Sequence, residues 1–278
     1  EMCIRDRYIT KHPEIARIAE EAGVDWIFVD MEFIGKDCRQ GGLDTVQNHH
    51  TVEDVANIRA AVTKAKVLVR INPIHDTMDD YPSSEEEIEA VIQAGADIVM
   101  LPYFKTTEEV HRFIGYVGGR AKTCLLVETP EAADLLDQIV EIDGIDMIHI
   151  GLNDMHLALK MKFMFQLLTD GSVDKWTRII AQKGIMYGFG GLASLNGGAV
   201  PGRMILKEHY RLGSQMVIVS RAFCNTDNMT DLDKVRSIFN NGIADIRKME
   251  NEMNKLSKED FKNNHKAVCN AVGIIVKK

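Results

Sequence analysis

Short apolar runs alternate with longer amphipathic segments along most of the chain, and each run has the length of a buried strand. Strands are predicted at residues 7–10, 26–29, 67–71, 97–101, 123–127, 145–150, 185–189 and 216–219. Helical patterns lie between them. Regular strand–helix alternation predicts a parallel sheet, and eight such units predict a closed (β/α)₈ TIM barrel. A doubly wound open sheet is the alternative, but no GxGxxG follows the first strand.

Helix boundaries have recognisable signals in this pattern. Pro13 opens a helix over residues 14–22 that Gly23 ends, and Thr51 with Asp54 forms a capping box for a helix running to about residue 64. The chain opens with Glu1 and without clear periodicity, so we expect the first strand to be truncated.

The last part of the chain has a different pattern. Residues 232–256 and 257–272 are predicted to form two charged helices with more apolar positions than one barrel helix needs. We therefore expect a barrel over residues 1–229 and a C-terminal helical extension over 230–278. The extension either covers its own barrel or packs on a neighbouring subunit.

Composition and charge narrow the function. The chain has 278 residues, 45% hydrophobic and 27% charged, and a formal net charge of −8, which argues against nucleic acid or an anionic membrane as a partner. No apolar run approaches the roughly 18 residues of a membrane span, and no signal peptide is visible. The chain has five scattered cysteines and no CxxC pair: Cys3, Cys38, Cys124, Cys224 and Cys269. This pattern supports neither a disulfide framework nor a structural zinc site, and it indicates a reducing cytoplasm.

Two acidic residues follow neighbouring strands in a strand–helix–strand unit. Glu128 and Asp154 come after the apolar runs 124–127 and 145–150, with an amphipathic segment over 130–142 between them. Parallel strands end at the same edge of a sheet, so both carboxylates are placed to bind one hard divalent cation. The alternative is that Glu128 only favours the start of the following helix, where negative charge is stabilised.

The phrases around these two acids resemble a known signature. LLVETPEA (125–132) and IHIGLNDMHLAL (148–159) are similar to the paired motifs of the HpcH/HpaI aldolase and citrate lyase beta-subunit family. The resemblance implies a TIM barrel, Mg²⁺ or Mn²⁺ on Glu128 and Asp154, and a homo-oligomer with C-terminal helices at subunit contacts. It also implies that backbone groups near Gly151, Asn153 and Asp154 receive a substrate carboxylate.

Arg70 is a charged residue inside the apolar strand VLVRINP. A buried guanidinium must be paired, because an unpaired buried charge is very costly. Arg70 then has one of two roles. It is either a structural ion-pair partner of Asp30 or Glu32, or its guanidinium N–H groups donate hydrogen bonds to a substrate carboxylate or enolate oxygen. The segment resembles the family's VVRP strand, and that resemblance implies contact with the oxo acid.

The segment FVDMEF resembles the family's DGEH or LDLED segment, which implies that Asp30 and Glu32 bind metal-bound water or orient the arginine. The aldolases follow these acids with a histidine base, but Phe33 stands at that position. The long loop 34–50 carries His49 and His50, which are our candidate bases because imidazole titrates near neutral pH. A metal-bound water oriented by Glu32 is the competing candidate, and His50 has the alternative role of leading into the helix capped by Thr51.

A glycine-rich segment follows the seventh predicted strand. Gly190 and Gly191, with Gly197 and Gly198 further on, either cradle a phosphate together with Arg221 or only allow a tight loop.

Two histidines lie near the second acidic motif. His149 is in an apolar strand, where a hydrogen-bonded core histidine is commoner than a ligand. His156 is expected at most to line the site.

The combined pattern predicts a divalent-metal-dependent carbon–carbon lyase of aldolase type that acts on a small anionic 2-oxo acid or a related hydroxy-acyl compound. Two alternatives stay open: a phosphoenolpyruvate- or acyl-CoA-using lyase of the citrate lyase type, and a non-catalytic oxo-acid-binding homologue that lacks the base.

Overall fold

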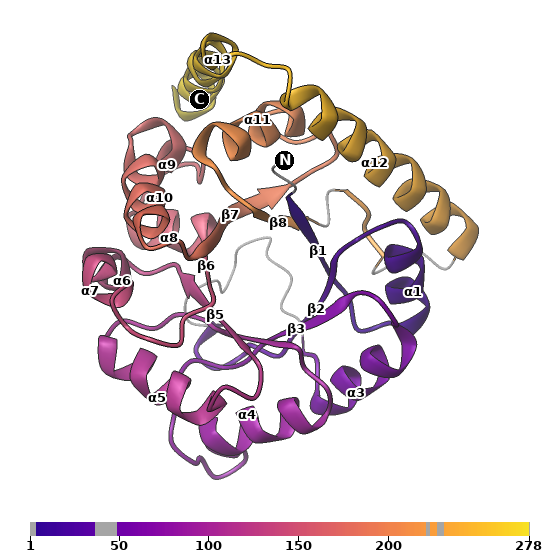
Figure 1. Ribbon diagram of the computed structural model, residues 1–278, viewed down its shortest axis with the longest axis vertical. Coiled ribbons are helices and arrows are strands. Elements are labelled where there is room, and N and C mark those ends of the chain that lie inside the picture. Colours follow the sequence, from indigo (N-terminus) through magenta and orange to yellow (C-terminus); the bar gives the residue numbers. More distant parts are fainter. Residues whose placement is uncertain (1–3, 37–48, 221–222, 227–230, 278) are drawn as a thin grey trace.

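The computed structural model describes residues 4–36, 49–220, 223–226 and 231–277. Eight parallel strands close a barrel in chain order, and β8 pairs with β1, so the predicted TIM barrel is confirmed. The strands are β1 (Arg5–Ile9), β2 (Trp26–Asp30), β3 (Lys66–Arg70), β4 (Ile98–Leu101), β5 (Lys122–Val127), β6 (Met147–Ile150), β7 (Met186–Leu192) and β8 (Met216–Val219). Figure 1 shows them at the centre of a ring of helices.

Helices connect the strands and follow the last one. They are α1 (Pro13–Glu21), α3 (Val52–Ala61), α4 (Ser84–Gln93), α5 (Thr107–Val117), α6 (Pro130–Asp134), α7 (Leu136–Ile139), α8 (Leu152–Ala158), α9 (Gln166–Thr169), α10 (Ser172–Gln182), α11 (Gly202–Leu212), α12 (Leu232–Met253) and α13 (Lys258–Lys277). The capping box of Thr51 and Asp54 is present at the start of α3. The segment predicted as one helix over 130–142 forms two, because Leu135, with a ψ of 3°, leaves the α-helical range between them.

The strands bury two separate sets of side chains. One apolar cluster fills the inside of the barrel and consists of Trp26, Phe28, Leu68, Ile98, Met100, Cys124, Leu126, Met147 and Met216. A larger cluster lies between the strands and the helices. Successive residues of a strand face opposite sides, so Asp30, Arg70 and Glu128 continue the inward-facing series of β2, β3 and β5 at the carboxyl end of the barrel.

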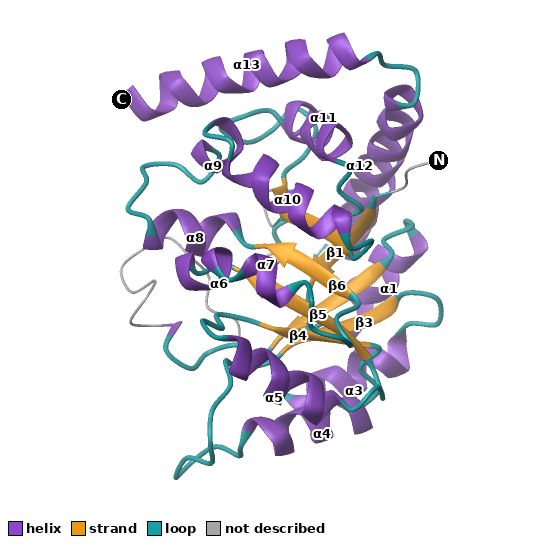
Figure 2. Ribbon diagram, turned by 60° about the vertical axis from the view of Figure 1, so that its left-hand side comes forward, coloured by secondary structure: helices purple, strands orange, loops and turns teal. Residues whose placement is uncertain are grey.

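The two C-terminal helices have different places in the fold. Helix α12 contacts α1 and α11 and closes the helical ring, burying Val235, Phe239 and Ile243. Helix α13 lies outside the ring across α9 and α11 (Figures 1 and 2), where Asn264 donates a hydrogen bond to the buried Glu208 at 2.8 Å. Of the predicted extension over 230–278, only α13 therefore stands apart from the barrel.

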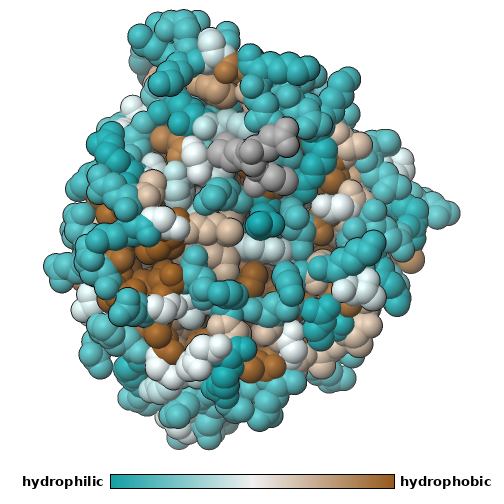
Figure 3. Space-filling view, in the orientation of Figure 1, coloured by the Kyte–Doolittle hydropathy of each residue, from teal (hydrophilic) through white to brown (hydrophobic). Residues whose placement is uncertain are grey.

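The outer surface is mainly hydrophilic on the face drawn in Figure 3, with apolar patches between the polar side chains. None of the described helices is both long and apolar enough to span a membrane.

Candidate active site

A cavity of about 420 Å³ lies at the carboxyl end of the barrel. Most of the predicted substrate and metal residues line it: Arg70, Glu128, Gly151, Asn153, Asp154, Gly190 and Gly191. His149, Ile218 and Ser220 are also in its wall. Strand ends that are far apart in the sequence therefore meet around one space, as they do at the catalytic end of other TIM barrels.

A larger cavity of about 890 Å³ lies at the amino end of the strands. Its lysines are already paired, since Lys66 contacts Asp97 at 3.2 Å and Lys122 contacts Asp146 at 2.6 Å. Active sites of TIM barrels lie at the opposite end. We therefore place the candidate site in the smaller cavity.

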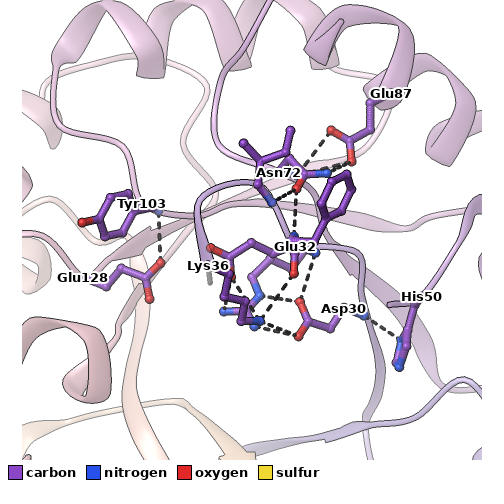
Figure 4. A network of polar contacts seen from close by, with 11 residues as sticks. Asp30, Glu32, Lys36, His50, Asn72, Glu87, Tyr103 and Glu128 are labelled. Atoms are coloured by element: carbon purple, nitrogen blue, oxygen red, sulfur yellow. Dashed lines mark hydrogen bonds and ion pairs between the residues drawn. The ribbon is translucent and has the colours of Figure 1, made fainter. Parts of the chain in front are cut away.

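Glu128 is a buried carboxylate, 3% exposed, directly after β5. The backbone N–H of Tyr103, which has a left-handed φ of 48°, donates to its Oε1 at 3.1 Å (Figure 4). The following helix α6 is capped by Thr129, whose side chain accepts from the N–H of Ala132. Thr129 therefore makes the capping hydrogen bond of α6, while Glu128 itself lines the cavity.

Gly151 allows Glu128 to approach the end of β6. A Cβ atom at position 151 would lie 2.7 Å from the Cβ of Glu128 and 2.9 Å from its Oε2, closer than real Cβ contacts. The register of Val127 against Ile150 brings these two strand ends side by side. Asp154 follows in the first turn of α8, whose N-cap is Gly151.

The pair of carboxylates fits a hard divalent cation. The donors are oxygen atoms only, which suits Mg²⁺ or Mn²⁺ rather than zinc, and the space beside Glu128 Oε2 is kept open by the missing side chain of Gly151. Within the described residues there is no cluster of three or more His, Cys, Asp or Glu side chains that would hold a metal by itself. An ion bound by Glu128 and Asp154 would take its other ligands from water and substrate, which is usual for Mg²⁺.

Arg70 is paired with the acids that end β2. Its Nε and Nη2 donate to Asp30 Oδ1 and Oδ2 at 2.7 and 2.8 Å, and its Nη1 lies 3.2 Å from Glu32. Burial alone would lower the pKa of Arg70, but the charges of Asp30 and Glu32 outweigh it and raise the pKa above its ordinary value. These contacts use three of the five N–H groups of the guanidinium, and the side chain still lines the cavity.

Lys36, which no sequence motif indicates, completes this network. Its Nζ lies 3.3 Å from Asp30 Oδ2 and 3.5 Å from Glu32 Oε2, and all three side chains are buried (Figure 4). Two carboxylates and two cations therefore balance each other beside the cavity. The spacing of Glu32 and Lys36, four residues apart, was the available signal, but it lies in a segment without periodic pattern.

Phe33 stands beside this network and is 36% exposed. Asn72 Oδ1 accepts hydrogen bonds from the backbone N–H groups of Phe33 and Ile34, both at 2.9 Å. The ring of Phe33 packs edge-on against Tyr81 with 4.9 Å between centroids. This segment lines a second cavity of about 400 Å³.

His49 and His50 line that second cavity and not the one formed by Arg70 and Glu128. The backbone N–H of Asp30 donates to His50 Nδ1 at 3.0 Å, and burial lowers the pKa of His50 to about 4. The structure therefore does not bring the two predicted bases to the candidate site, since the ring of His50 is held against β2. Arg221, the other predicted ligand, lies outside the described residues.

Strand β7 runs to Leu192, beyond its predicted end at residue 189, so Gly188, Gly190 and Gly191 lie within the strand. A Cβ at Gly188 would lie 2.1 Å from the carbonyl oxygen of Met216, and Gly190 has a left-handed φ of 53° at the irregularity between β7 and β8. A Cβ at Gly197 would lie 2.5 Å from Ser194 Oγ. Gly188 and Gly190 therefore require glycine for backbone packing and conformation without a phosphate, which favours the tight-loop alternative.

The two histidines noted in the sequence, His149 and His156, have different places. His149, 1% exposed, contacts Arg7 Nη2 through Nδ1 at 2.5 Å and the Gly190 carbonyl through Nε2 at 3.2 Å. His149 is thus the satisfied buried histidine that its sequence position predicts. His156 contacts the Leu152 carbonyl at 3.3 Å and is not in the cavity wall.

The fold and site define a (β/α)₈ barrel whose carboxyl end carries a cavity lined by Arg70, Glu128 and Asp154. The sequence profile of the HpcH/HpaI aldolase/citrate lyase family matches residues 9–166, so the chain belongs to that family.

Similar proteins carry related names. The chain is 26% identical over 174 residues to a 4-hydroxy-2-oxovalerate aldolase of Novosphingobium aromaticivorans and 25% identical over 179 residues to a hydroxypyruvate/pyruvate aldolase of Roseobacter denitrificans. Each match covers 52% of this chain, and the matches span 58% and 60% of those relatives.

Solved structures share the fold at low identity. An HpcH/HpaI aldolase from Desulfitobacterium hafniense is 17% identical with a TM-score of 0.59, covering 78% of this chain and 86% of that one. The citrate synthase SbnG is 14% identical with a TM-score of 0.61, covering 85% and 94%. These likenesses concern the fold alone.

Proposed function

We propose that the protein is a divalent-metal-dependent carbon–carbon lyase of aldolase type that acts on a small 2-oxo acid. The observation that carries this proposal is the meeting of Glu128, Asp154 and Arg70 on one cavity at the carboxyl end of the barrel. Family membership and the aldolase names of the two relatives support it.

The residues of the site have separate roles in this proposal. Glu128 and Asp154 would hold Mg²⁺ or Mn²⁺, which when bound supplies a Lewis acid for the oxo oxygen. Arg70, fixed by Asp30 and Glu32, offers its remaining N–H groups to the charge that develops when the carbon–carbon bond breaks. Gly151 keeps side-chain atoms away from the metal ligands and leaves space for the substrate carboxylate.

Metal binding is tested by calorimetric titration of Mn²⁺ into the wild type, Glu128→Gln and Asp154→Asn. Both variants should lose most of their affinity, because each removes one of two anionic ligands. Glu131→Gln is the matched control, since Glu131 is a half-exposed carboxylate three residues from Glu128 that pairs with Lys105. Equal affinity in all four proteins would refute the metal site.

Activity is tested by NMR through metal-dependent exchange of the methyl protons of pyruvate with deuterated water. Exchange in the wild type and its loss in Glu128→Gln would support enolate formation at this site. Metal binding without exchange would favour the non-catalytic oxo-acid-binding alternative.

A further inference from the structure

Arg7 is a fully buried guanidinium on β1, inside the barrel. Its Nη2 contacts His149 Nδ1 at 2.5 Å, and its guanidinium carbon lies 5.5 Å from the centre of the Trp26 ring. Its Nε and Nη1 have no hydrogen-bond partner within the described part of the chain. Burial lowers the pKa of Arg7 to about 10, so the side chain keeps its charge at neutral pH.

No carboxylate among the described residues forms an ion pair with this charge. The neighbouring Asp6 lies 2.9 Å from Arg247 instead. Burial raises the pKa of the adjacent Cys124 to about 11, so that residue is a neutral thiol. A buried cation without a counter-charge is strongly destabilising, and its presence needs a compensating anion or a functional reason.

Arg7 fixes the tautomer of His149. A guanidinium only donates hydrogen bonds, so Nδ1 of His149 must be the acceptor and must lack a proton. The ring proton therefore sits on Nε2, which donates to the carbonyl of Gly190 at 3.2 Å, at the long end of the ordinary range. Burial and the charge of Arg7 also hold the pKa of His149 well below its ordinary value, so the ring stays neutral.

This histidine borders the candidate site. His149 and its acceptor Gly190 both line the cavity that contains Arg70, Glu128 and Asp154. The charge of Arg7 polarises the imidazole and strengthens Nε2–H as a donor, because successive hydrogen bonds in a low-dielectric interior reinforce one another. The same geometry prevents His149 from acting as a general base, since Nε2 already carries the proton.

We infer that Arg7 and His149 form a relay in which the single His149 Nε2–H, now 3.2 Å from the Gly190 carbonyl, is shared between that carbonyl and an anionic oxygen of the ligand in the cavity. The ligand class is a small carboxylate such as a 2-oxo acid or its enolate, and this part rests on the proposed function. His149 contacts the ligand, and Arg7 is a positioning residue that acts through it. The bound anion then provides the counter-charge that Arg7 lacks in the protein.

The tautomer is measured without any ligand by ¹H–¹⁵N NMR of the full chain labelled at histidine, with His149→Gln used to assign the signals. We expect an unprotonated Nδ1 and a protonated Nε2 for His149 across neutral pH. In Arg7→Met the preference for this tautomer should disappear. A protonated Nδ1 in the wild type would overturn the relay.

The donor role is measured with Mg²⁺ and oxalate, a two-carbon dianion resembling pyruvate enolate. Oxalate should shift the Nε2–H signal of His149, and His149→Phe should weaken oxalate binding by about tenfold or more, the effect of removing a hydrogen bond to a charged group. His149→Gln, which keeps an N–H donor, should recover part of the affinity. His156→Gln is the control and should bind like the wild type, because His156 is not in the cavity wall.

The outcomes separate this inference from the proposed function. Unchanged oxalate affinity in a folded His149→Phe would overturn the donor role while leaving the metal site intact. Failure of the wild type to bind Mg²⁺ and oxalate would overturn the proposed function, and the donor role with it. The ligand-free tautomer tests the contact between Arg7 and His149 in either case.

Discussion

Replacing Gly151 with alanine adds one methyl group at the point where β6 ends beside Glu128. The backbone of Gly151, with φ −83° and ψ 90°, has a negative φ, so alanine meets no left-handed strain there. The effect must therefore come from contacts. The new Cβ would lie 2.7 Å from Glu128 Cβ, 2.9 Å from Glu128 Oε2 and 3.2 Å from Leu126 Cδ1.

The size of the effect follows from these distances. Carbon atoms pack best at about 3.5–4.0 Å, so the carboxylate of Glu128 must move by roughly 1 Å. Overpacking of this kind costs about 1–3 kcal/mol of folding stability. A displaced ligand also weakens metal binding, and disturbing the groups that orient ligands typically costs about 10–100-fold in affinity. We expect Gly151→Ala to lose both stability and divalent affinity.

The assay combines thermal unfolding with calorimetric titration of Mn²⁺. Gly115→Ala is the matched control, because a Cβ there meets nothing within 4 Å and the residue lies inside α5. That control should gain about 0.5–1 kcal/mol, as glycine in a helix interior is unfavourable. If Gly151→Ala melts and binds Mn²⁺ like the wild type, Gly151 does not position Glu128 and the geometric argument for the metal site fails.

Four further predictions concern other parts of the molecule. Oxalate with Mg²⁺ should raise the melting temperature of the wild type but not of Arg70→Lys. A lysine ammonium is a point charge and cannot replace the planar guanidinium that Asp30 and Glu32 hold in place. Equal stabilisation of both proteins would mean that Arg70 has only a structural role. His50→Ala should keep the metal-dependent exchange of pyruvate protons, because His50 lines the cavity beside Phe33 and not the candidate site. Loss of exchange with intact metal binding would instead identify His50 as the base. Burial lowers the pKa of His209 from 6.5 to about 3. The neutral His209 side chain therefore stabilises the fold above pH 6.5, and this stability is lost as the pH falls towards 3, by at most about 1.4 kcal/mol per pH unit. The free energy of unfolding of His209→Gln, measured in urea, should depend less on pH. We propose that the predicted homo-oligomer forms through α13, where Ile274 is 61% exposed. Ile274→Glu should then give a smaller species than the wild type in sedimentation, and equal sizes would contradict a subunit contact on this face.

The barrel and the meeting of Glu128 with Asp154 were predictable because local sequence carries both. Each strand is a buried apolar run, and helix starts such as Thr51 carry their own hydrogen-bonding signal. Once the strands are known to be parallel, the residues after them meet at one end. This rule alone brings Glu128 and Asp154 to one cavity, as the structure has them.

The bases and the buried charges were less predictable because they depend on contacts between distant segments. His49 and His50 belong to a long loop whose sequence does not show which cavity it lines. Arg7 and His149 are 142 residues apart and meet only across the barrel, so no spacing connects them. In each case the residue type indicated possible chemistry, but the partner was set by the closure of the barrel.

The charges around the site fall into two groups. Asp30 and Glu32 are balanced by Arg70 and Lys36, so that network adds no net charge to the cavity. Among the residues that the structure describes, the carboxylates of Glu128 and Asp154 that line the cavity are therefore opposed by the buried charge of Arg7. An anionic substrate would meet net negative charge until a divalent cation neutralises these carboxylates. With the cation bound, the charge of Arg7 would remain to attract the anion, so the geometry favours metal binding before substrate.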